Sequence, residues 1–275
     1  MKTSFLQHIS RLFRARIIMF VLIGILSILL CIQIVYPSIE IVREKITLAH
    51  SPSGILAFDY GERHFSSKNP REYNIDAAEY FFEQAAHLNP DILYLHHQRA
   101  RIAFLRGDYG TALQEINIQI ELHGTSTPNS YYVRGLIEGF VGDYIDAASD
   151  YEEFLVFDPK DWAAINDYAW VLLKSGRSED AVKVTNEGLL LFPTNAWLLN
   201  SNAIALYEIH DIVHARLQAQ RAIVAVDALT DEQWSYAYPG NDPAIAHDGL
   251  NAFKLSTRTN LSATLLSTTT SARVQ

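Results

Sequence analysis

Hydrophobic and polar positions along most of this chain are spaced as pairs of short amphipathic helices require. Residues 128–159 show one pair, with YYVRGLIEGFVG as the first helix and IDAASDYEEFLVF as the second. Gly142 and Asp143 form the turn between them. Pro159 ends the second helix, because proline lacks the amide donor that a continuing helix needs. We therefore expect the apolar residues of the two helices to pack against each other.

The same pattern returns about every 34 residues. Gly107, Gly142 and Gly176 are separated by 35 and 34 residues, and Pro159 and Pro193 by 34. One alanine recurs at a constant phase in four units: Ala112, Ala147, Ala181 and Ala215. A period of this length predicts a stacked helical array, because a single helix pair cannot bury its apolar face alone.

These features resemble the tetratricopeptide repeat (TPR) family. The resemblance rests on the small residues Gly135 and Ala147, on Gly-Asp-Tyr at 142–144, on Tyr151 and on Asp-Pro at 158–159. It covers residues 54–227 and implies an all-α solenoid of about four to five helical hairpins. The expected units are about 54–90, 91–124, 125–159, 160–193 and 194–227. The first unit is degenerate, with an insertion at 66–73, and its completeness is left open.

The resemblance also implies that two charged pairs face each other within their repeats. Arg134 and Asp150 are sixteen positions apart, one on each helix of their unit, and Arg99 and Glu115 stand in the same relation one repeat earlier. A partly exposed pair of this kind contributes only ~0–1 kcal/mol. We interpret both pairs as setting the register between helices.

A different pattern occupies the N-terminus, where residues 17–36 are twenty positions without a charge. At about 1.5 Å per residue they would reach roughly 30 Å, the thickness of a bilayer core. We expect a transmembrane helix at 17–36, preceded by a basic cytoplasmic N-terminus at 1–16. A cleaved signal peptide has a shorter apolar region and a small-residue cleavage site. A lipoprotein signal has small residues before its cysteine, whereas Leu29 and Leu30 precede Cys31.

Flanking charge predicts the orientation of this segment. Four basic residues and no acid precede it, whereas the charges just after it cancel. The positive-inside rule then places the rest of the chain on the extracytoplasmic side, which is the periplasm for a bacterial inner membrane. The inverted alternative resembles organelle-surface import receptors, which carry their TPR units in the cytosol.

The remaining segments flank the array. Residues 37–53 read as a linker. Residues 228–256 read as a C-terminal cap, with a helix at 244–256 over Trp234, Tyr236 and Tyr238, because a solenoid must cover its last apolar face. Residues 257–275 are rich in Ser and Thr, and we expect them to be disordered.

Charge and motifs limit the function. The chain has a net charge of −9, and all 31 acidic residues follow the predicted span. Nucleic-acid binding is not expected, since phosphate contacts need clustered Lys and Arg. No catalytic, cofactor or metal motif is evident, so we expect neither a cofactor nor an enzyme. His96 and His97 are interpreted as surface or groove residues, and a hydrolase site at Asp242, His247 and Asp248 is the enzymatic alternative.

The resemblance implies a concave groove lined mainly by the first helix of each unit. Projecting the phase gives ten candidate peptide-binding residues, here called the groove residues. They are Tyr94, His97, Arg101, Tyr132, Leu136, Asn166, Trp170, Trp197, Asn200 and Tyr207. Side-chain amides donate and accept hydrogen bonds, which suits an extended peptide backbone, and aromatic rings supply rigid contact area. Several of these aromatics could instead be inter-repeat core.

These expectations combine into one interpretation. The chain reads as a membrane-anchored scaffold or assembly factor. Its exported array would bind a protein segment in the groove, and its residues 17–36 would contact the lipid bilayer. The resemblance offers an alternative, a periplasmic chaperone-like holdase beside secretion or envelope assembly machinery.

Overall fold

The computed structural model describes residues 19–20, 22–27, 37–68, 70–238 and 240–271. It divides into two compact units, 1–53 and 54–275. In the first unit, residues 22–27 and 37–50 are helical. Among the described residues, no helix is both long and apolar enough to cross a bilayer. The predicted N-terminus 1–16 and most of the predicted span 17–36 lie outside the described residues.

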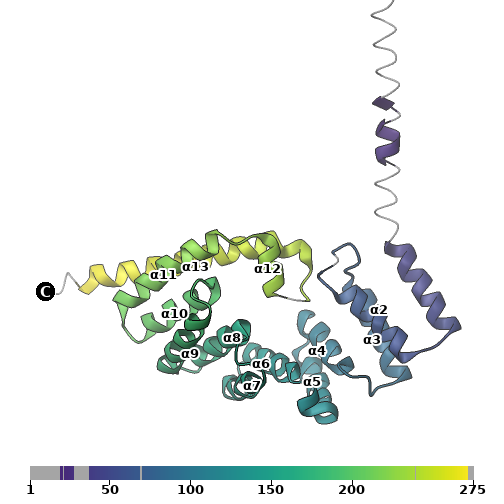
Figure 1. Ribbon diagram of the computed structural model, residues 1–275, viewed down its shortest axis with the longest axis horizontal. Helices are drawn as coiled ribbons and strands as arrows, with labels where there is room; N and C mark the ends of the chain where they lie inside the picture. Colours follow the sequence, from purple (N-terminus) through teal and green to yellow (C-terminus); the bar gives the residue numbers. More distant parts are fainter. Residues whose placement is uncertain (1–18, 21, 28–36, 69, 239, 272–275) are drawn as a thin grey trace, which may run out of the picture. The chain divides into compact units, whose positions relative to one another are not determined.

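The second unit is built from helix pairs that follow one another in an arc (Figure 1). Within the described part of 54–227 there are five pairs. They are α2 (Gly54–Phe65) with α3 (Ile75–Leu88), α4 (Leu95–Leu105) with α5 (Tyr109–His123), α6 (Asn129–Val141) with α7 (Tyr144–Phe157), α8 (Trp162–Lys174) with α9 (Ser178–Leu191), and α10 (Ala196–Glu208) with α11 (Ile212–Asp227). First helices also contact each other, since α6 touches both α4 and α8. The fold is therefore an all-helical solenoid.

The recurring glycines have a backbone role at the end of each first helix. Gly107, Gly142 and Gly176 have φ values of +77°, +98° and +77°. Glycine adopts this left-handed conformation without a steric penalty, and it ends a helix there. His210 occupies the equivalent position after α10, with φ +64°. It is therefore a non-glycine residue in the left-handed conformation that usually favours glycine.

Small residues let the two helices of a pair approach closely. A Cβ on Gly135 would lie 3.1 Å from the carbonyl oxygen of Ala147 and 3.3 Å from the Tyr151 ring. Ala147 and Tyr151 are both 0% exposed. The contact predicted from the repeat pattern is therefore present in the α6–α7 pair.

Both predicted charged pairs are confirmed. Arg134 donates from Nε to Asp150 Oδ2 at 2.6 Å and from Nη2 to Oδ1 at 2.7 Å. The distance from Arg99 Nη2 to Glu115 Oε1 is 3.0 Å. Because Asp150 and Glu115 are both buried, each arginine supplies the positive charge that a buried carboxylate requires.

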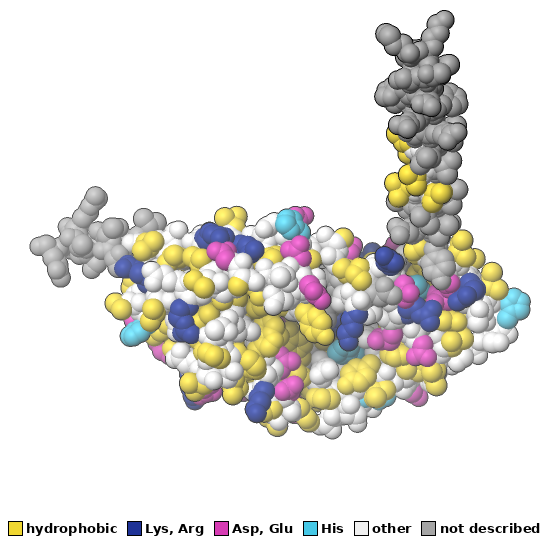
Figure 2. All heavy atoms as spheres, turned by 45° about the horizontal axis from the view of Figure 1, so that its top comes forward, with side chains coloured by type: hydrophobic (Ala, Val, Ile, Leu, Met, Phe, Trp, Pro, Cys, Tyr) yellow, Lys and Arg dark blue, Asp and Glu magenta, His cyan; other side chains and the backbone are white. Residues whose placement is uncertain are grey.

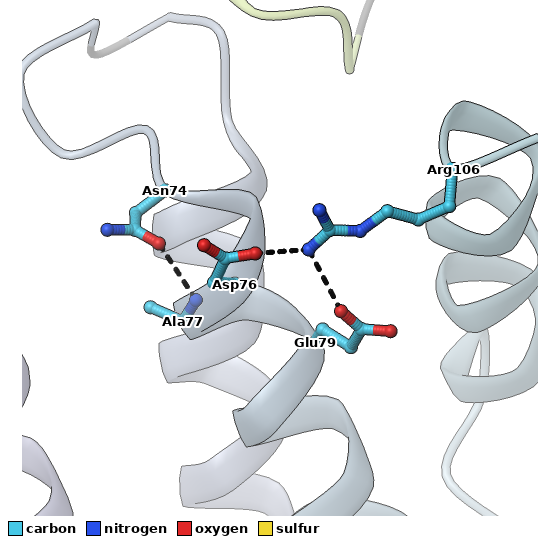
Figure 3. A network of polar contacts seen from close by, with 5 residues as sticks. All are labelled: Asn74, Asp76, Ala77, Glu79 and Arg106. Carbon is cyan, nitrogen blue, oxygen red and sulfur yellow. Dashed lines mark hydrogen bonds and ion pairs between the residues drawn. The ribbon is translucent and has the colours of Figure 1, made fainter.

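Neighbouring pairs are also joined at their surface. Asn74 caps the start of α3 by accepting a hydrogen bond from the amide of Ala77 at 2.9 Å. Arg106, just after α4, reaches back to Asp76 and Glu79 in the first turns of α3 (Figure 3). These side chains are well exposed, so the contacts add at most ~1 kcal/mol. They orient the first pair against the second.

The C-terminal segment corrects two expectations. It contains α12 (Asp231–Ala237), the 3-10 turn η2 (Pro243–Ile245) and α13 (Ala246–Ser271). The expectation of disorder from residue 257 is wrong through Ser271. The expectation came from the Ser- and Thr-rich composition of this segment. The segment is ordered because α13 packs on α10 and α11, which buries Thr257 and Thr264. Beneath the cap, Trp234 is 8% exposed, as expected, whereas Tyr236 is 77% exposed and does not pack there.

Candidate functional site

The groove residues lie on, or directly before, the first helices α4, α6, α8 and α10. Asn166 on α8 and Asn200 on α10 are 34 residues apart and occupy equivalent turns of their helices. Figure 2 shows hydrophobic side chains gathered in a hollow near the middle of one face of this unit. Four parts of the candidate site differ in their surroundings.

A polar network crosses the middle of the site from α6 to α10. Tyr132 donates to Asp167 Oδ2 at 2.7 Å, and Asn166 donates to Asp167 Oδ1 at 3.1 Å. Ser201 on α10 donates to Asn166 Oδ1 at 2.8 Å. Burial raises the pKa of Asp167 to about 6, although the hydrogen bonds from Tyr132 and Asn166 oppose this. The network aligns three consecutive first helices and uses part of the hydrogen-bonding capacity of Asn166.

This network predicts how stability depends on pH. The folded-state pKa of Asp167 is about 6 and its ordinary value is 3.8, so the folded state binds the proton more tightly. The free energy of unfolding should therefore fall by ~1–3 kcal/mol as pH rises from about 4 to about 6.5. Urea unfolding at a series of pH values measures this. In Asp167→Asn, the free energy of unfolding should change much less with pH over this interval. An unchanged slope in the variant would contradict the assignment.

The beginning of the site is largely internal to the array. His97 is 7% exposed, and its Nδ1 lies 3.1 Å from Ser130 Oγ. Burial lowers the pKa of His97 to about 3, so the imidazole is neutral. His96 is equally buried, with Nδ1 2.6 Å from Glu115 Oε2. The interpretation of these histidines as surface or groove residues is therefore corrected. Tyr94, at the start of α4, is partly buried with its ring edge-on to His97.

A row of aromatic side chains runs along the ends of three first helices. The ring centroids of Phe104 and Phe140 are 4.9 Å apart, and those of Phe140 and Trp170 are 5.5 Å apart. Phe140 is 53% exposed. Because the row combines close aromatic packing with exposure, it offers apolar area to a partner. Leu136 and Tyr207 are partly buried on α6 and α10.

The last part of the site is covered by the protein's own C-terminal segment. Trp197 Nε1 donates to Tyr238 Oη at 2.9 Å, and its ring stacks on Phe253 at 5.2 Å between centroids. Asn260 on α13 donates to Asn200 Oδ1 at 2.9 Å. Trp197 and Asn200 are therefore engaged within the chain. The repeat phase alone carries no signal for this, because the covering segment lies outside the repeats.

Glu138 is a residue of this region that the sequence pattern does not single out. Burial and the nearby Asp150 carboxylate raise the pKa of Glu138 to about 8, while Arg134 opposes the shift. Its Oε2 is buried without a hydrogen-bond partner. The raised pKa favours the neutral form of this carboxyl group. Its position beside the Arg134–Asp150 pair makes it part of the helix interface.

The residues of the enzymatic alternative do not assemble a reactive group. Asp242 accepts from the amide of Ala244 at 2.9 Å and caps the turn before α13. His247 Nδ1 lies 3.2 Å from Asp231 Oδ2, with both side chains exposed. Within the described ranges, no group of three or more His, Cys, Asp or Glu side chains is placed to hold a metal.

Comparisons with known proteins bear on the fold. In sequence, no protein-family model and no curated protein matches the chain. In structure, the chain is similar to the MamA protein, with TM-score 0.54, 13% identity and coverage of 67% of this chain and 94% of that one. It is also similar to YrrB, described as a TPR protein with an unusual peptide-binding site, with TM-score 0.55, 12% identity and coverage of 67% and 93%.

A third structure, a tetratricopeptide repeat protein from Parabacteroides merdae, has TM-score 0.55 and 15% identity, and covers 81% of this chain and 90% of its own. At these identities the likeness concerns the fold alone. The helical array of this chain therefore has the fold of tetratricopeptide repeat proteins.

Proposed function

We propose that this protein is a membrane-anchored, non-enzymatic interaction module that binds a protein segment along the first helices of its array. The observation that carries the proposal is the aromatic row of Phe104, Phe140 and Trp170, which is exposed at Phe140 although large aromatics usually pack inside a solenoid. The peptide-binding site named for the structurally similar YrrB supports the same type of function.

The side chains suit an extended segment with apolar residues. Aromatic rings supply rigid contact area at little conformational cost, and such rings dominate binding energy at interfaces. The amide of Asn166 and the carboxylate of Asp167 lie on the same helix as Trp170 and could order a peptide backbone beside the rings. The described groove has no repeated Lys/Arg–Asn arrangement, so a carboxylate-terminated tail is not the favoured ligand.

The proposal places the array outside the cytoplasm. It rests on the twenty uncharged residues at 17–36 and on the basic residues before them. Fusing one reporter that is active only outside the cytoplasm to the C-terminus, and one active only inside it to a parallel copy, tests the orientation. We expect only the external reporter to be active. Activity of the internal reporter alone would move the array, and the search for its partners, to the cytosol.

Site-specific crosslinking tests the binding surface. We expect a photo-reactive amino acid at Phe140 or Trp170, in the full chain in its native membrane, to give one stoichiometric adduct. Ile145 on α7 is the matched control, because it is 81% exposed but lies on a second helix. Phe140→Ala should weaken partner binding about thirtyfold, which corresponds to the ~2 kcal/mol of one hot-spot residue. Equal adducts from position 145 would contradict the groove.

The same experiment separates the proposal from its alternative. A holdase would crosslink to many unfolded clients from both positions and would suppress their aggregation. A scaffold or assembly factor would give one partner, and Phe140→Ala would weaken the adduct formed from position 170 while leaving the fold intact.

A further inference from the structure

The stretch between α12 and η2 crosses from the end of the array to its beginning. We call residues 238 and 240–242 the strap; they bracket residue 239, which lies outside the described residues. Tyr73, between α2 and α3, donates from its Oη to the carbonyl oxygen of Gly240 at 2.7 Å. Burial and the Asp242 carboxylate raise the pKa of Tyr73. Figure 1 shows α12 between the two ends of the arc of helices.

A side chain at position 240 would require the Arg101 guanidinium to move. Its φ is +96°, and a Cβ there would lie 2.4 Å from Arg101 Nη2 and 3.4 Å from the Phe65 ring. Arg101 is held in that place, with its guanidinium 4.8 Å from the centre of the Phe65 ring and Nη1 donating to Gln98 Oε1 at 2.7 Å. A backbone turn thus sits on a cation and an aromatic ring, as a bound peptide would.

The other end of the strap rests on the last first helix. Tyr238 accepts the hydrogen bond from Trp197, and its ring lies 4.6 Å from that of Trp234. The Asp167 carboxylate is near enough to help raise the pKa of Tyr238, although burial is the larger cause. The strap therefore contacts Arg101 on α4 and Trp197 on α10, at opposite ends of the groove residues.

We propose that the strap is a built-in ligand of the groove, and that an external partner competes with it by presenting an extended segment in which an aromatic residue is followed by a glycine turn. This inference rests on the proposed function and deepens it by naming the chemistry of the ligand. Competition is feasible because the strap is short and partly exposed. Tyr238 is 37% exposed, and the preceding α12 has only seven residues.

Competition lowers the apparent affinity for an external ligand, because only molecules whose groove is open can bind it. The smaller this open fraction is, the weaker the apparent binding. Variants that release the strap should therefore bind a ligand more tightly than the native chain. Gly240→Ala is the releasing variant, because it introduces both the clash with Arg101 and an unfavourable φ. Gly142→Ala is the matched control. Its φ is +98°, nearly the same, but a Cβ there meets nothing within 4 Å.

The test uses the full chain in detergent and two measurements. Hydrogen–deuterium exchange follows the peptide that covers the strap. Fluorescence anisotropy follows a labelled synthetic peptide of residues 231–245, DEQWSYAYPGNDPAI. We expect slow exchange of the strap in the native chain and in Gly142→Ala, and fast exchange in Gly240→Ala. The peptide should bind Gly240→Ala at least about tenfold more tightly than the other two.

The possible failures have different meanings. Fast exchange of the strap in the native chain would overturn the inference, because the strap would not be docked. Equal peptide affinity for all three proteins would overturn the competition and leave groove binding intact. Absence of peptide binding to Gly240→Ala, with its strap shown to be released, would overturn the inference. Crosslinking of an external partner from Phe140 would then decide separately whether the proposed function stands.

Discussion

Replacing Tyr151 by alanine should lower the free energy of unfolding by about 3–5 kcal/mol, the usual cost of removing a large aromatic side chain from a core. Tyr151 is 0% exposed between α6 and α7. Its ring packs edge-on against Tyr132 at 5.6 Å between centroids. It also lies beside Gly135, where the two helices approach each other closely. The loss would leave a cavity at the centre of the array. Urea unfolding followed by circular dichroism measures it.

Two variants show whether this loss comes from packing. Tyr151→Phe keeps the ring and removes a hydroxyl that is buried without a hydrogen-bond partner. It should leave stability unchanged or raise it by up to ~1 kcal/mol, since an unsatisfied buried polar group is unfavourable. Tyr236→Ala, at a tyrosine that is 77% exposed, should change stability by less than about 0.5 kcal/mol. A large loss in Tyr151→Phe would show that the hydroxyl has a partner.

Replacing Trp197 by alanine should cost about 3–5 kcal/mol and should also detach the C-terminal cap. The Trp197 ring is 9% exposed and lies between Trp162, at 4.9 Å between centroids, and Phe253 of α13. Its Nε1 also holds Tyr238. One side chain thus joins α8, α10 and α13. Hydrogen exchange should become faster throughout α13, whereas α4 and α5 should keep their protection, because repeats in a solenoid contact only their neighbours.

Two tryptophan variants make this prediction specific. Trp197→Phe preserves ring packing but loses the hydrogen bond to Tyr238, so it should cost roughly 1 kcal/mol and leave α13 protected. Trp170→Ala removes a partly buried tryptophan that contacts Phe140 and Tyr144 on the preceding pair, so it should not release α13. Loss of α13 protection in Trp170→Ala would mean that the cap responds to instability anywhere in the array.

The repeat period was sufficient to predict the helix pairs. Spacing of glycines and alanines is a local property, since each unit folds through contacts within about 34 residues and with the next unit. The turn at Gly142, the close approach at Gly135 and the Arg134–Asp150 pair therefore follow from positions that recur along the sequence. The phase also placed the groove residues on first helices.

The repeat phase does not predict whether each of those residues is buried or exposed. Exposure depends on which side chain of the next repeat fills the space, so His97 became buried against Ser130 while Phe140 stayed 53% exposed. Composition was also a poor guide at the C-terminus. A Ser/Thr-rich sequence predicts disorder when considered alone, yet Thr257 is 0% exposed because α13 has α11 beside it.

The periodic helices, the turns between them and the charged pairs within them follow from the amino-acid sequence alone, because all of these depend on neighbours close along the chain. Contacts between segments far apart along the chain arise only once the repeats have packed. Tyr73 and Gly240 meet across 167 residues, and that contact depends on the curvature accumulated by the packed pairs between them. The periodic pattern does not predict this contact. The curvature of the stack is a sum of small rotations between neighbouring repeats, and no single repeat shows that sum.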